Sequence, residues 1–336
     1  MVIVSLFIEL CSLSFIRGTF FKHESNYIYE VDENLNTKQT NFYVTFKYNP
    51  FSEGAFRYCY IGNINNKGNQ NSNKNLFPTG KCVVKVFKND LYEKSEIISD
   101  LNNIFYSQKI SKEFNSQNLI NRKVIFVDNY LATFKEKAVI NLFEKRAFTE
   151  LEPMIIEPYI EGKYEKFTSN SGWIKDNIDI IIPLFMHWNW VYSKGEKLVS
   201  DIQGVKKGDI YELTDPAVQS INKEYGDTDL GAVGLIYFLS EHKHNSYCQS
   251  LPWPNNEEIK KIQKVSKCLR RKRGTSFKFE LEGCNKDEIK NLYRKVINST
   301  FNNTLLYIII ILVIIIVIVI IFLLINKKKK PNEKLD

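Results

Sequence analysis

The sequence predicts an α+β protein that carries a transmembrane helix near its C-terminus, and three patterns support this. Between Tyr27 and about Tyr60, apolar and polar residues alternate around turn clusters, as in antiparallel strands. Residues 92–115 then place apolar side chains at helical spacing before strand patterns return. Finally, residues 305–325 form one uncharged run that lacks glycine and proline. With 336 residues and 44% hydrophobic content, the chain can bury a sizeable core.

The first 26 residues form an apolar N-terminal extension. Residues 1–18 resemble the apolar part of a signal peptide, but they lack a basic start and Glu9 interrupts them. Two interpretations stay open, an extension packed on the domain and a signal or membrane segment.

The segment from 27 to about 157 is predicted to form a small α+β lobe of strands around one helix. After the first strands, residues 61–81 are rich in Asn, Lys and Gly, which predicts a surface loop. The remaining elements of this lobe are a buried strand at 81–88, the helix at 92–115, and strands within 122–135 and 153–160.

Beyond Tyr164 the pattern changes to longer elements and then to a charged region. Apolar segments occupy 180–193 and 196–205, and a helix is predicted over 230–243. We place the end of the folded domain at 254. A charged helical linker at 255–304, the transmembrane helix at 305–325 and a basic tail at 326–336 follow.

The run at 305–325 is interpreted as membrane-spanning because a helix of this length reaches roughly 31 Å, about one hydrocarbon core. A buried core helix is the alternative. The formal charge of +8 is concentrated in Lys327–Lys330, which suits lipid headgroups, and in residues 269–274. The second cluster is interpreted as a solvated loop, with contact to acidic lipid, nucleic acid or an acidic partner as alternatives. We expect a lipid membrane and no nucleic acid as partner. Six cysteines without disulfide-like spacing suit a reducing compartment.

Lys85 lies in the middle of the apolar strand at 81–88. A buried ammonium needs a partner, and such a lysine commonly binds nucleotide phosphates while pairing with a helix glutamate, here Glu93 or Glu96. If Lys85 shares a face with Val83 and Phe87, it points where the apolar side chains point. The alternative is an edge strand with Lys85 in solvent.

Asp201, Gln203 and Asp215 form a second constellation. Asp201 and Gln203 are two residues apart at a strand end, so one carboxylate and one amide oxygen share a face and could bind magnesium. Asp215, in a Thr-Asp-Pro turn, could orient a hydroxyl nucleophile and accept its proton. Ordinary turns are the alternative.

A glycine-rich stretch precedes the helix predicted at 230–243. Gly226, Gly231 and Gly234 would let backbone amides approach an anion at the helix N-terminus. The alternative is a flexible loop in which Asp229 caps the helix.

His242, His244 and Cys248 lie within seven residues, and His187 could add a fourth ligand from another element. Three imidazoles and one thiolate would close a tetrahedral zinc site, which is structural because no position stays open. The alternative is two surface histidines and one core cysteine.

Taken in order, six blocks between about Phe46 and Leu251 resemble the alpha-kinases, a family of atypical protein kinases. The blocks are PFSEGAFRYCY, CVVKVFK, IIEPYIEGKYEKFTSNSG, FMHWNWVYSKGEKLVSDIQGV, LTDP and YGDTDLGAVGLIYFLSEHKHNSYCQSL. The resemblance implies a two-lobed protein-kinase-like fold with a structural zinc site, and an activity that transfers the ATP γ-phosphate to serine or threonine in proteins.

Carried over by position, the resemblance implies a role for each site residue. Those implied to act in catalysis or phosphate binding are Lys85 and Arg57 at the phosphates, Asp201 and Gln203 on magnesium, and Asp215 beside the substrate hydroxyl. Those implied elsewhere are Glu157 and Ile160 near the adenine, Asp229 and Gly231 in the cofactor loop, and His187, His242, His244 and Cys248 on zinc.

The chain departs from the family pattern in four places. His244 stands where the family usually has cysteine, so we expect weaker zinc affinity. Thr228 and Asp229 replace Gly-Asn, the stretch between Gln203 and Asp215 is longer than usual, and soluble members lack the membrane segment.

The expected protein is thus a membrane-anchored alpha-kinase, with a pseudokinase or membrane scaffold as the rival. Topology separates two further interpretations. Unpaired cysteines and the use of ATP predict a cytosolic kinase domain, and the alternative is the opposite, receptor-like orientation, which Lys327–Lys330 and the sequons at Asn298 and Asn302 favour.

Overall fold

The computed structural model describes residues 22–25, 27–47, 49–67, 80–88, 94–135, 149–270 and 285–328. Within these, the side chains of 22–23, 94, 270, 302–310 and 321–328 are not described. The predicted N-terminal extension therefore lies outside the described residues, except for its last few positions. The end of the basic tail from residue 329 onward also lies outside them.

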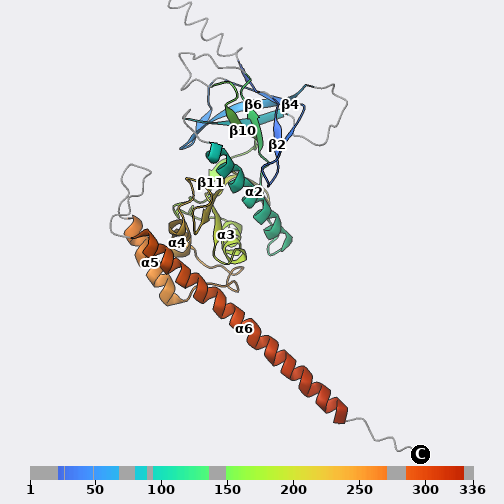
Figure 1. Cartoon of the computed structure of the whole chain (residues 1–336), viewed down its shortest axis with the longest axis vertical. Coiled ribbons are helices and arrows are strands. Elements are labelled where there is room, and N and C mark those ends of the chain that lie inside the picture. The colour runs from blue at the N-terminus through green and yellow to red at the C-terminus, as the bar shows by residue number, and fades with distance from the viewer. Residues whose placement is uncertain are drawn as a thin grey trace, which may run out of the picture. The chain divides into compact units, whose positions relative to one another are not determined.

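The chain divides into two compact units, each described by itself. Unit 1 comprises residues 1–167, 201–217 and 225–227, and unit 2 comprises 168–200, 218–224 and 228–336. In Figure 1 the strands of the nine-stranded sheet of unit 1 run from blue to green, and the long C-terminal helix of unit 2 is orange to red. The domain bounds expected from the sequence stay a prediction.

Unit 1 is built on a nine-stranded sheet whose pairings are all antiparallel. Its order is β1-β4-β6-β7-β10-β9-β2-β3, and β5 pairs with β6. The strands are β1 (Lys22–Glu24), β2 (Tyr29–Val31), β3 (Thr37–Gln39), β4 (Phe42–Lys47), β5 (Ser52–Glu53), β6 (Arg57–Asn66), β7 (Gly80–Phe87), β9 (Tyr130–Thr133) and β10 (Pro153–Pro158).

Strand β7 has two different buried faces, and this decides where Lys85 lies. Cys82, Val84 and Val86 belong to the main core cluster of the sheet, so the alternate residues 83, 85 and 87 face the other side. Because β7 runs between β6 and β10, the edge-strand alternative for Lys85 is wrong. The predicted sharing of a face by Lys85 and the apolar side chains at 83 and 87 agrees with this register.

The rest of unit 1 is one long helix and a four-stranded sheet. Helix α2 (Lys94–Ser116) packs against β8 (Lys123–Phe126), and the sheet order is β11-β13-β14-β8. Strands β11 (Tyr164–Lys166), β13 (Gln203–Lys207) and β14 (Ile210–Thr214) complete it. Gly204 is needed in β13, since it has φ +149° and a Cβ there would lie 2.1 Å from the Glu212 carbonyl oxygen.

Unit 2 packs helices around a two-stranded pairing of β12 (Lys197–Ser200) with β15 (Ala217–Ser220). Helices α3 (Ile181–Tyr192) and α4 (Ala232–Glu241) are mostly buried, which matches their apolar sequences. Helix α5 (Asn256–Arg270) and helix α6 (Lys286–Lys328) both pack against α4.

Two sequence expectations change in the structure. Residues 61–66 of the predicted surface loop continue strand β6, because Gly62 and Ile64 alternate into the core while Asn63 between them faces outward. The predicted transmembrane run at 305–325 falls partly on side chains that are not described. Among the described residues, no helix has the length and hydropathy needed to cross a membrane. The α+β class itself is confirmed.

Candidate active site and histidine–cysteine cluster

Lys85 is the centre of a buried ion-pair cluster in unit 1. Its side chain is 4% exposed, and its Nζ lies 2.7 Å from Glu157 Oε1 and 2.8 Å from Asp215 Oδ2. It also donates a hydrogen bond of 3.0 Å to Thr214 Oγ1, and the Thr214 hydroxyl donates to Glu157 Oε2. Strand pairing produces this assembly, since β7 and β10 lie side by side with Ile155 opposite Lys85.

The charges on Lys85 and Asp215 stabilise each other, whereas burial raises the pKa of Glu157 above its ordinary value despite the nearby Lys85. Burial opposes the charge on Lys85, but Asp215 and Glu157 outweigh it and hold the pKa of Lys85 above its ordinary value. Burial likewise opposes the charge on Asp215, yet Lys85 and Arg57 hold the pKa of that carboxyl below its ordinary value. Lys85 and Asp215 are therefore both charged at neutral pH.

Arg57 links this cluster to helix α2. Its guanidinium pairs with Asp100 of α2 and lies 3.6 Å from Asp215 Oδ1. The sequence expectation paired Lys85 with a glutamate of this helix. Instead, Lys85 pairs with Glu157 of β10 and with Asp215, and it is Arg57 that pairs with α2. The first of the two expected partners, at position 93, lies outside the described residues.

Asp201 and Gln203 lie beside Asp215, as the predicted magnesium site requires. Gln203 Nε2 donates to Asp201 Oδ2 and to the Asp215 backbone oxygen, each at 3.2 Å, and Lys166 Nζ lies 2.6 Å from Asp201 Oδ1. A carboxylate that draws an ammonium into contact suits a divalent cation, and the Gln203 amide oxygen is a second hard ligand. These residues fit a magnesium ion.

Both aspartates have a left-handed backbone, with φ of +55° at Asp201 and +48° at Asp215. This region is sparsely populated for residues other than glycine, although aspartate tolerates it better than most. Left-handed residues of this kind cluster at functional sites, where the surrounding structure holds them in place. Asp201 and Asp215 share this conformation with several other residues of the chain, so it agrees with a functional site here but does not identify one.

The two residues expected near the adenine have different surroundings. Glu157 is buried, and its carboxylate contacts Lys85 and Thr214, while its place near the adenine stays a prediction. Ile160 follows β10 in a half-buried position. Its contact with adenine stays a prediction.

Asp229 and Gly231 belong to unit 2, where they shape the turn before α4. Asp229 Oδ1 accepts from the backbone amides of Ser220 and Gly231 at 2.9 and 2.8 Å, and Oδ2 accepts from the Ser220 hydroxyl at 2.5 Å. Gly231 has φ +70° and is itself the N-cap of α4, so Asp229 is not the helix cap. Contact of either residue with a cofactor stays a prediction.

His187, His242, His244 and Cys248 come together in unit 2. One ligand atom from each lies within 4.8 Å of the others. The Cys248 Sγ and His242 Nε2 atoms are 3.6 Å apart. Metal bonds of about 2.3 Å to sulfur and about 2.05 Å to nitrogen, at a tetrahedral angle, put these two atoms at about 3.6 Å. This one separation therefore matches an edge of a tetrahedral metal site, and the other ligand atoms lie near enough to complete it after small shifts.

Two further features fit a metal. His187 Nε2 hydrogen-bonds with the Pro252 carbonyl oxygen at 3.0 Å, and its Nδ1 is buried without a hydrogen-bond partner among the described residues. That arrangement makes Nε2 the donor and leaves Nδ1 to bind a metal, as ligating histidines commonly do. Burial lowers the pKa of His187 to about 4 and that of His242 to about 2, so both imidazoles are neutral, the form that binds metals.

The Trp253 ring packs against the three histidines of the cluster. The Trp253 ring centroid lies 4.8 Å from His187, 5.0 Å from His242 and 4.8 Å from His244, and 5.7 Å from Trp190. His244 is the exposed member of the set, so solvent reaches the cluster from its side. The alternative of unrelated surface histidines does not describe this packing.

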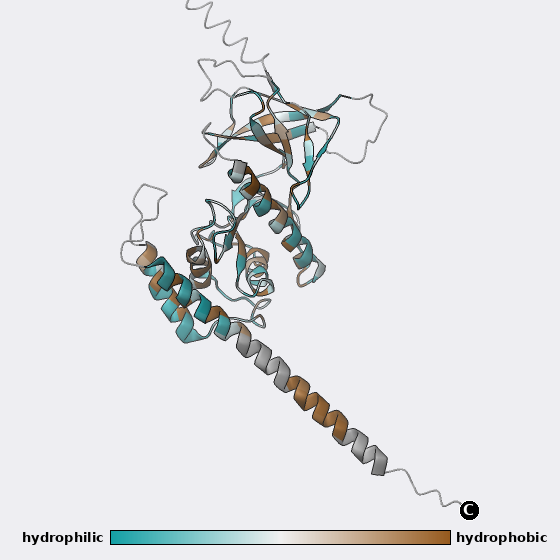
Figure 2. Ribbon diagram, viewed as in Figure 1, coloured by the Kyte–Doolittle hydropathy of each residue, from teal (hydrophilic) through white to brown (hydrophobic). Residues whose placement is uncertain are grey.

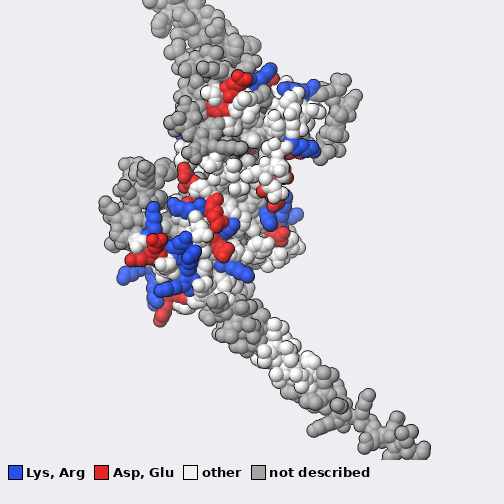
Figure 3. Space-filling view, in the orientation of Figure 1, with Lys and Arg blue, Asp and Glu red and all other residues white. Residues whose placement is uncertain are grey.

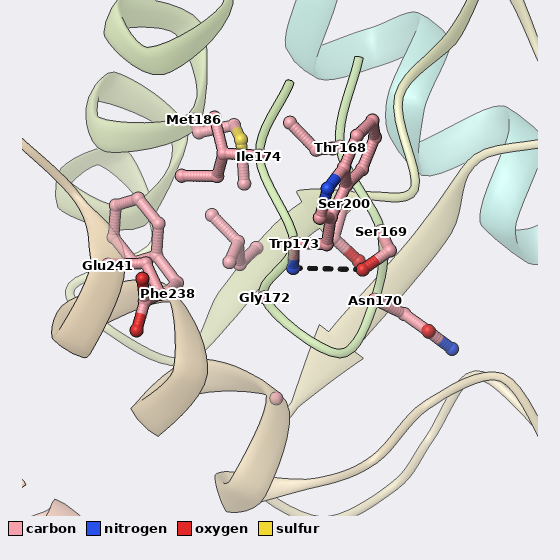
Figure 4. Close-up of a pocket in the computed structure, with 12 residues that line it drawn as sticks. Thr168, Ser169, Asn170, Gly172, Trp173, Ile174, Met186, Ser200, Phe238 and Glu241 are labelled. Carbon is pink, nitrogen blue, oxygen red and sulfur yellow. Dashed lines mark hydrogen bonds between the residues drawn. The ribbon is translucent and has the colours of Figure 1, made fainter. Parts of the chain in front are cut away.

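Unit 2 also contains a pocket distinct from the cluster (Figure 4). Trp173 and Phe238 contribute apolar surface, and Glu241 adds a carboxylate. The loop that carries Trp173 is held by a hydrogen bond from its backbone amide to Ser169 Oγ, at 3.0 Å, drawn dashed in Figure 4. Gly234 of the glycine-rich stretch lines this pocket, but the residues that the family resemblance implies for catalysis, cofactor or zinc do not.

The geometry also contains residues that the sequence did not indicate. Asp100, Lys166 and Thr214 contact the predicted site residues directly. Thr214 could have been suspected because it precedes Asp215. Asp100 and Lys166 carry no such signal, since charged residues of this kind are common on the surface of any helix or strand.

Comparison with known proteins places this arrangement in a family. Residues 52–248 match the model of the alpha-kinase family. The chain is 30% identical to alpha-protein kinase vwkA of Dictyostelium discoideum over 251 residues, which is 69% of this chain and 35% of that protein. It is 41% identical to human eukaryotic elongation factor 2 kinase over 98 residues, which is 29% of this chain and 13% of that protein. The chain thus spans about a third or less of these relatives.

Solved structures establish the same fold. An alpha kinase from Entamoeba histolytica matches with a TM-score of 0.56 at 24% identity, covering 70% of this chain and 93% of that one. The alpha-kinase domain of myosin-II heavy chain kinase A in complex with AMP-PNP matches with a TM-score of 0.54 at 22% identity, covering 69% and 96%. The resemblance seen in the sequence is confirmed. The chain belongs to the alpha-kinase family.

Proposed function

We propose that this chain is an ATP-dependent serine/threonine protein kinase of the alpha-kinase type, which transfers the γ-phosphate of ATP to protein hydroxyls. The observation that carries the proposal is the buried Lys85–Glu157 pair, joined by the partly exposed Asp215, beside Asp201 and Gln203. All five residues lie within the stretch that matches the family. Relatives solved with AMP-PNP and with ADP support ATP as the phosphate donor.

Each residue of the cluster has a role in this proposal. Glu157 orients Lys85, whose ammonium neutralises phosphate charge, and Arg57 adds a second cation beside it. Asp215 faces the substrate hydroxyl, orients it and accepts its proton. Magnesium held by the Asp201 carboxylate and the amide oxygen two residues on would supply charge neutralisation at the transferred phosphate. Positioning supplies much of the rate enhancement in phosphoryl transfer.

The test is phosphate incorporation by the full chain from radiolabelled ATP, with and without Asp215→Asn. We expect the substitution to lower turnover by about 10²–10⁴-fold, while the chain stays folded. Asp209→Asn is the matched control, since Asp209 is an exposed aspartate in the β13–β14 turn, and it should keep parental activity.

Two outcomes would reject parts of the proposal. A parent chain that labels no protein, itself included, would indicate the pseudokinase or scaffold instead. Parental activity in Asp215→Asn would reject the role of Asp215 but leave the kinase function standing.

The histidine–cysteine cluster is proposed to bind a structural zinc ion. Its ligand set of three imidazoles and one thiolate is of the kind zinc prefers, and with four protein ligands it offers no open position for chemistry. The zinc would tie α3, which carries His187, to the end of α4, where His242 follows. Elemental analysis of the purified chain should find one zinc per molecule.

Membrane anchoring through residues 305–325 is likewise proposed. Helix α6 runs without interruption through this stretch, and the described side chains Ile311–Ile320 are all apolar and each about half exposed. Figure 2 shows this part of α6 as strongly hydrophobic, and Figure 3 shows it without charge. With a cytosolic kinase domain, protease added outside intact cells should leave the domain uncut. Protease added to inside-out vesicles should remove it.

A further inference from the structure

Helix α6 is packed into unit 2 before it reaches the proposed membrane segment. Its buried residues recur along one face, and they are Ile289, Tyr293, Val296, Ile297 and Thr300. The helix then continues to Lys328 with no glycine or proline, so its first turns and the run at 305–325 are one rigid element.

Tyr293 fixes α6 to the turn that follows α3. The Tyr293 hydroxyl accepts a hydrogen bond of 2.7 Å from Trp190 Nε1 and donates one of 2.6 Å to the Gly195 carbonyl oxygen. Both partners belong to the end of α3 or to the turn directly after it. Since Tyr293 is fully buried, these bonds are shielded from water.

The same turn lies tightly against α6 one to two helical turns further on. A Cβ at Gly195, which has φ +80°, would lie 2.6 Å from Ile297 Cγ2 and 3.2 Å from Phe301 Cε2. The Trp190 and Phe301 ring centroids are 5.2 Å apart. The turn at 192–196 is therefore held beside Ile297 and Phe301.

This contact sets the depth of the turn relative to a bilayer. Phe301 precedes Leu305 by four residues, which is about 6 Å along a helix. The headgroup layer on each side of the hydrocarbon core is about 5–7 Å thick. A membrane that contains residues 305–325 therefore brings its headgroups to the level of this turn.

Tyr192 and Lys194, two of the three exposed residues of the turn, suit that layer, whereas the third, Glu196, is acidic. Tyr192 is 50% exposed and stacks on Trp188, and Lys194 is exposed at φ +54°. Tyrosine is enriched at membrane interfaces, and lysine pairs with lipid phosphate. We propose that the turn at 192–196 contacts the phospholipid headgroups of the membrane that holds residues 305–325. The proposal rests on the membrane anchoring proposed above.

The test uses the full chain in vesicles of phosphatidylcholine and phosphatidylserine, with a photoreactive amino acid introduced at position 194. The matched control is position 286, also an exposed lysine, at the start of α6 and about 28 Å before Leu305. We expect a lipid adduct at position 194 and none at position 286. With the photoreactive group moved to 192, Lys194→Glu should reduce the phosphatidylserine adduct, and Lys286→Glu should leave it unchanged.

The outcomes separate the two proposals. A chain that an alkaline wash removes from the vesicles overturns the anchoring and the headgroup contact together. A chain that stays with the vesicles but forms no adduct at position 194 overturns the contact alone. Equal adducts at positions 194 and 286 also overturn it, because the chain would then lie along the surface instead of standing on a rigid α6.

Discussion

The Lys85 cluster of unit 1 and the histidine cluster of unit 2 both place polar groups inside the protein, but these groups find their interaction partners in different ways. The first is made of acidic and basic side chains that pair with one another, Lys85 with Glu157 and Asp215 and Arg57 with Asp100. The second is made of neutral imidazoles and one thiol, and the buried Nδ1 of its α3 histidine has no hydrogen-bond partner among the described residues.

This difference predicts two kinds of sensitivity. A cluster of paired charges is complete without an ion, so it should respond to the loss of a partner side chain. A cluster of neutral ligands is incomplete without its ion, so it should respond to the loss of metal. Each of the following experiments separates the two regions by one of these properties.

Metal removal should have the largest effect, and it should act through unit 2. In the full chain, a zinc chelator should lower the free energy of unfolding by about 5 kcal/mol or more, because metal binding contributes directly to folding. Urea unfolding followed by tryptophan fluorescence measures this, since Trp253 and Trp190 lie at the cluster. The Asp201→Asn variant, treated with the same chelator, should lose as much free energy of unfolding as the parent chain. An unchanged unfolding curve after chelation would contradict a structural metal.

Loss of a charge partner should come next, and it should act through unit 1. Lys85→Met should lower the free energy of unfolding by about 3–5 kcal/mol, because the buried Glu157 carboxyl group then lacks its cation. Adding Glu157→Gln to the same chain should restore part of this loss. Urea unfolding of both single variants and of the double variant gives the coupling energy. Additive effects would show that the pair does not act as a unit.

The strand that carries Gln203 offers a smaller test of how tightly the charged site is built. Gly204→Ala should cost about 3 kcal/mol, since its Cβ would meet the Glu212 carbonyl oxygen at 2.1 Å. Gly208→Ala, in the same hairpin at φ +58° and with open space around it, should cost only about 1 kcal/mol. Thermal unfolding compares the two. Equal losses would mean that backbone conformation alone requires glycine here.

The last effect is gradual, a pH dependence that arises in the histidine cluster. In the metal-free chain, burial lowers the pKa of His187 to about 4, whereas an unfolded histidine titrates near about 6.5. The unfolded chain therefore binds more protons below that value, so the stability is present above a pH of about 6.5 and is lost as the pH falls towards 4. The slope should approach about 1.4 kcal/mol per pH unit for each histidine. The free energy of unfolding of the chelated His187→Gln variant should fall less steeply with falling pH than that of the chelated parent chain.

Much of the fold follows from local patterns in the chain. The helical spacing at 92–115 became α2 (Lys94–Ser116), and the apolar strand at 81–88 became β7 (Gly80–Phe87). Such patterns predict structure because apolar residues that repeat every two or every 3.6 positions decide which face of a strand or helix is buried. The loop prediction was wrong for the asparagine-rich start of 61–81, because the burial of Ile64 against the sheet outweighed the effect of its polar neighbours.

The contacts within the two sites were harder to predict from the sequence than the fold was. Their residues were chosen from motifs, and motifs carry no information about which carboxylate reaches which amine. Glu157 became the partner of Lys85 because β10 pairs with β7 in one register, and Asp100 reached Arg57 because α2 presents it there. Helical spacing within 92–115 could not have selected Asp100 over the other charged residues of that helix.

The sequence by itself determined the α+β class, the family, the four residues of the histidine–cysteine cluster and the apolar run at 305–325. Each of these is a local pattern or an ordered set of motifs that survives without knowledge of contacts. Only the tertiary structure decided how the charges pair, why Asp229 shapes a turn, and how Tyr293 of α6 is held against the turn after α3. These outcomes depend on side chains distant in sequence meeting in one buried environment, and local residue patterns do not encode such meetings.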